Sequence, residues 1–179
     1  MRTRTRTLAV LALTAAAALG TSPPVGNPGW DKLKSLAGEW KGTYAGTDEA
    51  AGGMGEVRLT YRLVSNGTAL METMESGHDA EMITMYYPEG NRILATHYCS
   101  IGNQPRLASA GLTGNGKILK FSLVDATNAS GPDAELMQGL VVTFRDADHF
   151  SQAWTSRAKG KDQVGTFTYT RVPQKPGAR

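Results

Sequence analysis

Residues 56–76 read EVRLTYRLVSNGTALMETMES, two stretches of alternating polarity joined by Asn66-Gly67. Asn-Gly is the strongest short hairpin signal in a sequence, and a two-residue loop here pairs Ser65 with Thr68. Counting outward from this turn gives the further pairs Leu63–Leu70, Tyr61–Glu72 and Leu59–Met74. The apolar residues of both strands then share one face, so the pattern predicts that this face is the interior of a sheet protein.

Similar turn signals recur along the rest of the chain and separate stretches rich in β-branched and aromatic residues. We predict ten strands, at residues 38–45, 56–64, 68–76, 81–87, 92–99, 103–111, 117–125, 137–144, 149–157 and 163–172. Short connections make neighbouring strands antiparallel, and one short helical stretch, WDKLKSL at 30–36, precedes them. The sequence therefore predicts an all-β, ten-stranded antiparallel up-and-down barrel with one short N-terminal capping helix.

The N-terminus has the layout of a secretory signal peptide, with three arginines, an apolar run and small residues before a cut after Gly20. We expect residues 1–20 to be the signal peptide, 21–29 a linker, 30–172 the barrel domain and 173–179 a C-terminal tail. The expected location is periplasmic or secreted. The apolar run is short for a bilayer, so we expect no membrane span in the mature protein.

The basic balance of the whole chain comes from this leader. The chain has 19 Lys+Arg against 16 Asp+Glu, a net charge of +3 and a pI near 9.1. Without Arg2, Arg4 and Arg6 the two signs are equal. The composition therefore gives no reason to expect a nucleic-acid partner.

The same counting extends the inner face to the other strands. Pairing Ser76 with Glu81, and then closing a hairpin through residues 88–91, directs these residues inward: Ile83, Met85, Tyr87, Leu94, Thr96 and Tyr98. Pairing through residues 113–116 adds Gln104, Arg106, Ala108 and Ala110, with Asp125 as a further candidate. The last two strands add Gln152, Trp154, Phe167 and Tyr169. His97 and Cys99 in THYCSIGNQPR would then face outward, which argues against a metal or thiol site there.

The predicted interior mixes polar side chains with apolar ones, and two interpretations stay open. Glu72 and Arg106 form a paired, hydrogen-bonded core network, or they line a wet cavity and orient a ligand. In the second interpretation Arg106, paired with Glu72 or Asp125, anchors the head of a small amphipathic or hydrophobic ligand. The candidate ligand-binding residues are Tyr61, Glu72, Thr96, Tyr98, Gln104, Arg106 and Trp154.

AGEWKG at 37–42 contains Gly38-x-Trp40 at the start of the first strand. This resembles the G-x-W signature of the lipocalin and calycin barrels. The resemblance implies that Trp40 packs at the closed end of the barrel beneath a basic residue of the last strand. Arg171 in FTYTRV is the matching residue, and it would place a guanidinium over the indole face. Trp40 and Arg171 are thus the candidate residues of structural barrel closure.

The combination of LAGEWKG, ITMYY, THYCSIGNQPR, FSLVDATN and DADHFSQAW resembles an uncharacterised family of exported bacterial proteins. That family is a domain of unknown function with a lipocalin-like or nitrobindin-like barrel, and the resemblance covers residues 30–172. It implies a fold and a compartment, but no ligand, activity or catalytic residue. Nitrobindin-like proteins bind haem through a histidine that projects into the barrel. The last strand here, TFTYTR, has none, so we expect no haem and no other cofactor.

Three function classes remain, and binding of a small molecule in the barrel interior is the first. The second is a small-barrel isomerase or hydrolase that uses Glu72 with Tyr61 or Tyr98 as acid and base. The third is a filled structural or interaction barrel without a ligand. Outward apolar residues would mark a homo-oligomer surface in such a barrel; the candidates are Met71, Met82, Tyr86 and Ile93. No catalytic residue and no metal ligand is predicted.

Overall fold

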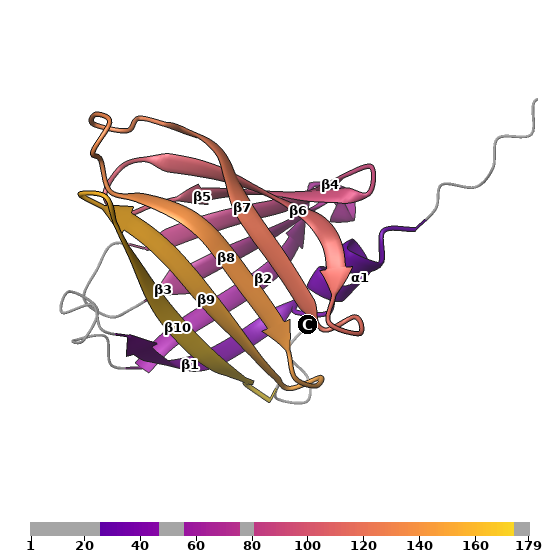
Figure 1. Cartoon of the computed structure of the whole chain (residues 1–179). Helices are drawn as coiled ribbons and strands as arrows, with labels where there is room; N and C mark the ends of the chain where they lie inside the picture. The colour runs from indigo at the N-terminus through magenta and orange to yellow at the C-terminus, as the bar shows by residue number, and fades with distance from the viewer. Residues whose placement is uncertain (1–25, 47–55, 76–80, 174–179) are drawn as a thin grey trace, which may run out of the picture.

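Ten antiparallel strands close into a barrel, and one short helix lies at one end of it (Figure 1). The computed structural model describes residues 26–46, 56–75 and 81–173. Each strand pairs with its neighbours in sequence, and β1 pairs with β10 to complete the closed barrel. The all-β, up-and-down fold predicted from the sequence is therefore confirmed. Within the described residues, no helix has the length and apolar character needed to cross a membrane.

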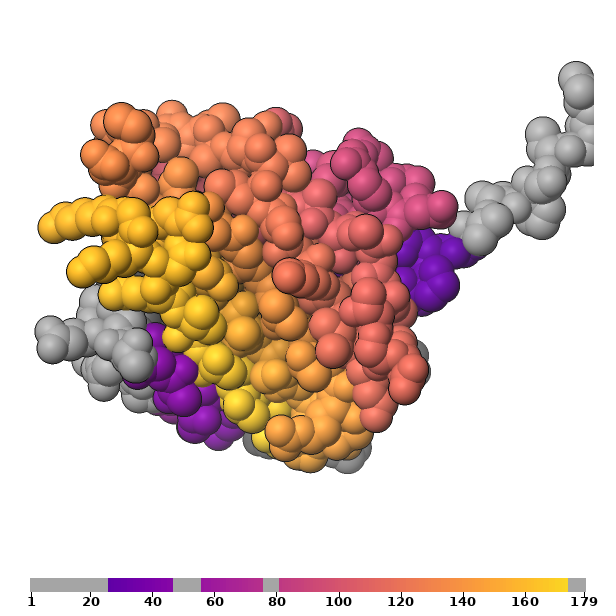
Figure 2. All heavy atoms as spheres, in the orientation of Figure 1, coloured from indigo at the N-terminus to yellow at the C-terminus, as the bar shows by residue number. Residues whose placement is uncertain are grey.

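The elements follow one another in the order of the barrel wall. They are α1 (Pro28–Lys34), β1 (Gly38–Gly46), β2 (Glu56–Val64), the short 3-10 turn η1 (Ser65–Gly67), β3 (Ala69–Glu75), β4 (Met82–Glu89), β5 (Arg92–Tyr98), β6 (Gln104–Thr113), β7 (Ile118–Thr127), β8 (Leu136–Phe144), β9 (His149–Ala158) and β10 (Lys161–Arg171). Figure 2 shows that side chains of β7 to β10 cover the barrel wall that faces the viewer.

The register predicted for the β2–β3 hairpin is confirmed. Tyr61 pairs with Glu72, and Val64 and Ala69 are the last pair before the turn. Asn66 and Gly67 have φ values of 53° and 80°, which this tight turn requires and which Asn and Gly adopt at least cost. The residues of the two strands that face the core are Val57, Leu59, Tyr61, Leu70, Glu72 and Met74, and all are buried.

The orientation predicted for β4 and β5 is wrong. Met74 pairs with Met82 rather than with Ile83, and this slip of one residue turns every side chain of β4 to the other face. Because Thr84 pairs with His97, β5 is turned as well. The buried inner residues of the two strands are Thr84, Tyr86, Ile93, Ala95 and His97. Tyr86 and Ile93 therefore belong to the core and not to an outer surface for homo-oligomer contact.

The orientation predicted for β6 is also wrong, for a different reason. Next to the turn at residues 113–116, Thr113 pairs with Ile118, but the register shifts between Ser109 and Leu112 and again between Arg106 and Leu107. Such irregularities are β-bulges, which add a residue to one strand. The side chains directed inward are Pro105, Leu107 and Ser109. Gln104, Arg106, Ala108 and Ala110 are not among them.

The helix end of the barrel is densely packed. Asn27 caps α1 by accepting a hydrogen bond from the Trp30 backbone N–H at 3.0 Å, and Pro28 follows at a position where proline suits a helix. Leu33 of α1 and Leu36, which follows the helix, are buried in the same core cluster as Trp40. The Trp40 indole N–H donates to the Leu36 carbonyl at 2.8 Å. This arrangement plugs one end of the barrel with apolar side chains.

Arg171 completes this end from the last strand. Its guanidinium carbon lies 4.1 Å from the centre of the Trp40 ring, so the expected contact is present. The guanidinium also donates to the backbone carbonyls of Ala37 at 3.0 Å, Ser35 at 2.8 Å and Ala147 at 3.1 Å. A basic side chain thus joins the α1–β1 connection to the β8–β9 turn over the face of the indole.

Candidate functional site

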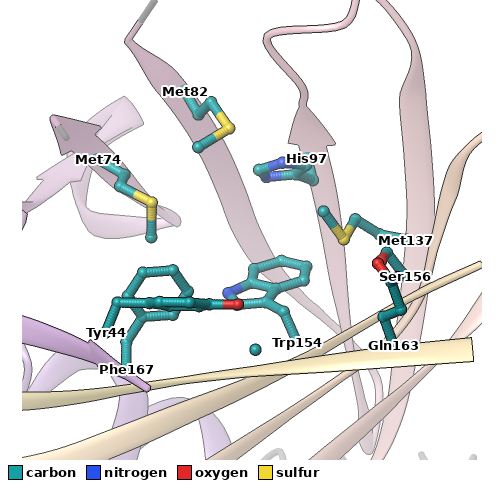
Figure 3. A pocket seen from close by; sticks show the side chains of 10 residues that line it. Tyr44, Met74, Met82, His97, Met137, Trp154, Ser156, Gln163 and Phe167 are labelled. Carbon is teal, nitrogen blue, oxygen red and sulfur yellow. The ribbon is translucent and has the colours of Figure 1, made fainter. Parts of the chain in front are cut away.

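A pocket lies at the end of the barrel opposite α1 (Figure 3). Along the β1–β10 ladder, the pair Trp40–Arg171 marks the helix end and the pair Gly46–Gly165 marks the pocket end. The empty space in the pocket is about 560 Å³, a value that includes open solvent. Its lining residues are Tyr44, Met74, Met82, His97, Met137, Trp154, Ser156, Gln163, Gly165 and Phe167. Most of this lining is apolar or aromatic.

His97 lies inside this lining and is only 5% exposed. Its Nδ1 atom lies 3.0 Å from the Thr84 hydroxyl, and its ring lies 4.9 Å from the Trp154 ring. Its Nε2 atom has no hydrogen-bond partner, although it is buried. Burial lowers the pKa of His97 to about 4, so the imidazole is neutral at physiological pH.

Below the pocket, Glu72 is fully enclosed by hydrogen-bond donors. The Tyr61 hydroxyl, the Tyr86 hydroxyl at 2.9 Å and the Gln152 amide at 2.7 Å all donate to its Oε2 atom. The Thr84 hydroxyl donates to Oε1 at 3.4 Å. Glu72 is 1% exposed and does not line the pocket. It therefore contacts the pocket through Thr84 and His97, and not directly.

Burial dominates the electrostatics of this network. Burial raises the pKa of the Glu72 carboxyl, and the hydrogen bonds from Tyr61, Tyr86, Gln152 and Thr84 oppose that rise. The pKa values of the Tyr61 and Tyr86 hydroxyls are raised well above their usual range by burial and by the nearby carboxyl. Both tyrosines are therefore neutral donors to Glu72.

Three of the predicted ligand-binding residues lie inside the barrel. Tyr61 and Glu72 belong to the buried network. Trp154 is buried at the base of the pocket, and Gln152, two residues earlier on the same face of β9, is buried as well. Phe167 and Tyr169, also predicted to point inward, are buried as well.

The other four do not face the interior. Tyr98 is 48% exposed, and Thr96 lies on the outer side of β5. The side-chain oxygen of Gln104 accepts hydrogen bonds from the Thr127 hydroxyl and the Asn128 amide near the end of β7. Arg106 forms a bidentate, exposed ion pair with Asp125 on the outer wall. Of the two partners suggested for Arg106, Glu72 and Asp125, the structure shows Asp125. The predicted inward orientation is wrong, because register shifts in the β6–β7 ladder turn both residues outward.

The sequence analysis missed His97, Met82 and Met137 as pocket residues. In β4, MITMYY offers Met82, Thr84 and Tyr86 on one face and Ile83, Met85 and Tyr87 on the other. In β5 the choice is between Ile93, Ala95 and His97 and Leu94, Thr96 and Tyr98. Both faces are equally apolar, so composition cannot select the inner one. An imidazole that alternates with Ile93 and Ala95 was the one available signal.

The remaining histidines and the cysteine lie elsewhere. His149 is half-buried and pairs with Asp146 at 2.8 Å in the β8–β9 turn, His78 lies outside the described residues, and Cys99 is partly buried just after β5. In the described part of the chain, no three His, Cys, Asp or Glu side chains gather in a way that would hold a metal ion. The inward position of His97 corrects the expectation that it faces outward, while the last strand lacks a histidine as the sequence shows.

No family model and no curated protein matches this chain. Among solved structures, it is similar to a protein of unknown function from the DUF3598 family of Nostoc punctiforme, with 15% identity and a TM-score of 0.52. The match covers 78% of this chain and 48% of that one, so the chain spans about half the length of the Nostoc protein. A second match, EF1p2_mFAP2b bound to DFHBI, has 12% identity, covers 80% of this chain and 99% of that one, and has a TM-score of 0.38. At 15% identity the likeness to the Nostoc protein shows a shared fold alone.

Proposed function

We propose that the protein binds a small, uncharged and mostly apolar molecule in the pocket at the end of the barrel opposite α1. The observation that carries this proposal is the buried, unpartnered Nε2 atom of His97 in an otherwise apolar lining. A buried polar atom without a partner costs about 1–3 kcal/mol. A ligand that donates one hydrogen bond to Nε2 would recover that cost while its apolar part is removed from water.

The lining also favours an uncharged ligand over an anionic one. None of the described residues that line the pocket is a lysine, arginine or acidic residue, and His97 is neutral because burial lowers its pKa. Arg106, the residue expected to anchor the polar head of a ligand, lies on the outer wall. An anion would therefore enter an apolar site without a counter-charge, which is costly.

The same geometry ranks the two other function classes lower. An enzyme based on Glu72 and Tyr61 needs its carboxyl to reach a substrate, but Glu72 is buried and does not line the pocket. Tyr98, the other proposed partner of Glu72, is exposed on the outer face. A filled structural barrel would have no hollow at either end, whereas the described residues leave a pocket at the end opposite α1.

Titration with N-phenyl-1-naphthylamine tests this proposal, because the dye combines two apolar ring systems with one N–H donor. We expect saturable binding of one dye per chain, with energy transfer from Trp154 to the dye. Ser156 lies inside the pocket and Ser151 lies on the outer side of the same strand. Ser156→Leu should therefore weaken binding by about tenfold or more, and Ser151→Leu should leave it unchanged. Equal binding by both variants, or no saturable binding at all, would rule the proposal out.

A further inference from the structure

The hydrogen bonds behind His97 determine which ring nitrogen carries the proton. The Thr84 hydroxyl has a single hydrogen, and it lies between Glu72 Oε1 at 3.4 Å and His97 Nδ1 at 3.0 Å. When Glu72 is ionised, Thr84 donates to the carboxylate and accepts from Nδ1–H. The Nε2 atom of His97 then presents a lone pair to the pocket.

Methionine side chains lie on either side of His97 in the pocket. Figure 3 shows His97 between Met82 and Met137, with Trp154 below the imidazole. Met82 precedes Thr84 by two residues, and Thr84 pairs with His97, so Met82 and His97 are diagonal neighbours on the inner face of the sheet. Met137 comes from β8, where it pairs with Ser156. With Met74, three of the seven methionines of the chain line this one pocket.

We propose that this end of the pocket binds a soft monovalent metal ion, Cu⁺, through Nε2 of His97 and the sulfurs of Met82 and Met137. Thioether sulfur and imidazole nitrogen are ligands that Cu⁺ prefers, whereas Mg²⁺, Ca²⁺ and Mn²⁺ prefer carboxylate and water oxygens. The donors are all uncharged, so a monovalent ion requires less compensating charge here than a divalent one.

The buried network around Glu72 supplies the hydrogen bonds that hold the histidine ligand of such a site. A histidine that binds a metal usually donates its other N–H to a fixed acceptor, which sets the tautomer and makes the ligand more basic. Here that acceptor is Thr84, which is itself held by Glu72. Among the described residues, the hydrogen-bond partners of Glu72 are all uncharged side chains. Glu72 is thus a positioning residue for the proposed site.

The proposal goes beyond small-molecule binding and does not depend on it. Dye binding tests the apolar volume of the pocket, and metal binding tests the three donor atoms, so either result can fail while the other holds. The free thiol of Cys99 would itself bind soft metals. The measurements therefore use the full-length chain carrying Cys99→Ser.

The experiment measures Ag⁺ binding by calorimetry and Cu⁺ binding in competition with bathocuproine disulfonate. We expect one tightly bound ion per chain. Met82→Leu with Met137→Leu, and separately His97→Phe, should each weaken binding by about a hundredfold or more. Met71 and Met85 form a pair on the outer face. The matched control, Met71→Leu with Met85→Leu, should bind as the parent does.

Glu72→Gln provides a readout that a purely structural role would not change. The side-chain amide can donate to Thr84, which then donates to His97 Nδ1 and leaves the proton on Nε2. Metal affinity should fall about tenfold to a hundredfold, the usual effect of changing a group behind a metal ligand. In protein labelled at the methionine methyl groups, Ag⁺ should shift the NMR signals of Met82 and Met137 and leave those of Met71 and Met85 in place.

Three outcomes would overturn the proposal. The first is the absence of tight binding once Cys99 is serine, because the thiol would then be the site. The second is an equal loss of metal affinity in the Met82→Leu/Met137→Leu variant and in the Met71→Leu/Met85→Leu control. The third is an NMR response confined to Met71 and Met85. The methyl signals also report whether each variant is folded, so a misfolded variant is recognised and replaced by the single Met82→Leu or Met137→Leu change.

Discussion

The two ends of the barrel differ in how their polar groups are satisfied. At the helix end, the Trp40 indole N–H and the Arg171 guanidinium reach backbone carbonyls of the α1–β1 connection and the β8–β9 turn. At the pocket end, His97 Nε2 is buried and has no partner. The Trp40 and Arg171 donors are paired without a ligand, whereas His97 Nε2 gains a partner when a donor or a metal ion arrives. The Tyr169 hydroxyl and Asn103 Oδ1 are also buried and unpaired, but neither residue lines the pocket, so His97 is distinguished by its place in the pocket lining.

Between the two ends, the Glu72 network forms a polar layer across the barrel. Tyr61, Tyr86 and Gln152 reach it from three other strands, and Thr84 links it to His97. This layer separates the apolar plug around Trp40 from the pocket. It also orients the His97 imidazole through Thr84, so the buried network determines which ring nitrogen faces the pocket.

The largest expected effect is the loss of the plug. Trp40→Ala should lower the free energy of unfolding by about 3–5 kcal/mol, because a large ring in full contact with α1 and Phe150 is removed. Trp154→Ala, which enlarges a pocket that already exists, should cost less than half as much. Urea denaturation followed by circular dichroism measures both. A loss below about 1 kcal/mol for Trp40→Ala would show that the helix end is not packed in this way.

The pH dependence of stability gives the next largest effect. In the metal-free protein the His97 pKa is about 4, whereas the unfolded histidine titrates near 6.5. As the pH falls through this window, the unfolded chain takes up a proton that the folded chain does not, so stability falls. The contribution is fully present above about pH 6.5 and decreases by about 3 kcal/mol toward pH 4.

The difference between wild type and His97→Phe isolates this contribution from that of Glu72. The raised pKa of Glu72 acts with the opposite sign, since the folded chain then binds a proton at pH values where the unfolded carboxyl has lost it. Denaturant titrations from about pH 7 to pH 4 give the two curves. Parallel curves would mean that His97 is not buried in the folded protein.

Thr84 and Thr96 offer a smaller, matched comparison of the inner and outer faces. Thr84→Val removes the hydroxyl that pairs with His97 Nδ1 and should cost about 1–3 kcal/mol by leaving a buried N–H without an acceptor. Thr96→Val lies on the outer face of the adjacent strand and should change stability by less than about 0.5 kcal/mol. Equal losses of stability in the two variants, measured by urea denaturation, would indicate that β4 and β5 have the orientation expected from the sequence.

The smallest effect is expected on the outer wall. Arg106 and Asp125 form an exposed ion pair, where solvent screens the attraction between the two charges. Arg106→Met should leave the urea midpoint and the binding of N-phenyl-1-naphthylamine unchanged. A tenfold loss of dye binding in this variant would show that the arginine does contribute to the ligand site.

The sequence was sufficient where a turn or a signature fixes the register. Asn66-Gly67 sets the β2–β3 pairing, and Gly38-x-Trp40 with Arg171 locates the helix end. Glu72 could be placed inside the barrel for the same reason. These signals are local, so they are independent of how the remaining strands align.

The pocket could not be derived in the same way, because its residues depend on loops and bulges. A slip of one residue between β3 and β4 decides whether His97 or Tyr98 points inward, and both faces of those strands are apolar. Two register shifts in the β6–β7 ladder, which have no clear signature in the sequence, decide the directions of Arg106 and Asp125. Single-residue shifts of this kind reverse a whole face, so errors in orientation extend along a strand even where the fold class is correct.

The central claim is that His97 presents the lone pair of a neutral imidazole to the pocket, and ¹⁵N NMR of the histidine rings tests it most directly. The chain has three histidines, and His97→Phe identifies the relevant signals. In the metal-free full-length protein with Glu72 ionised, we predict a proton on Nδ1 and none on Nε2, and a ring that stays neutral from about pH 8 to about pH 5. An Nε2–H tautomer, or a ring that titrates near pH 6.5 as an exposed histidine does, would contradict the account.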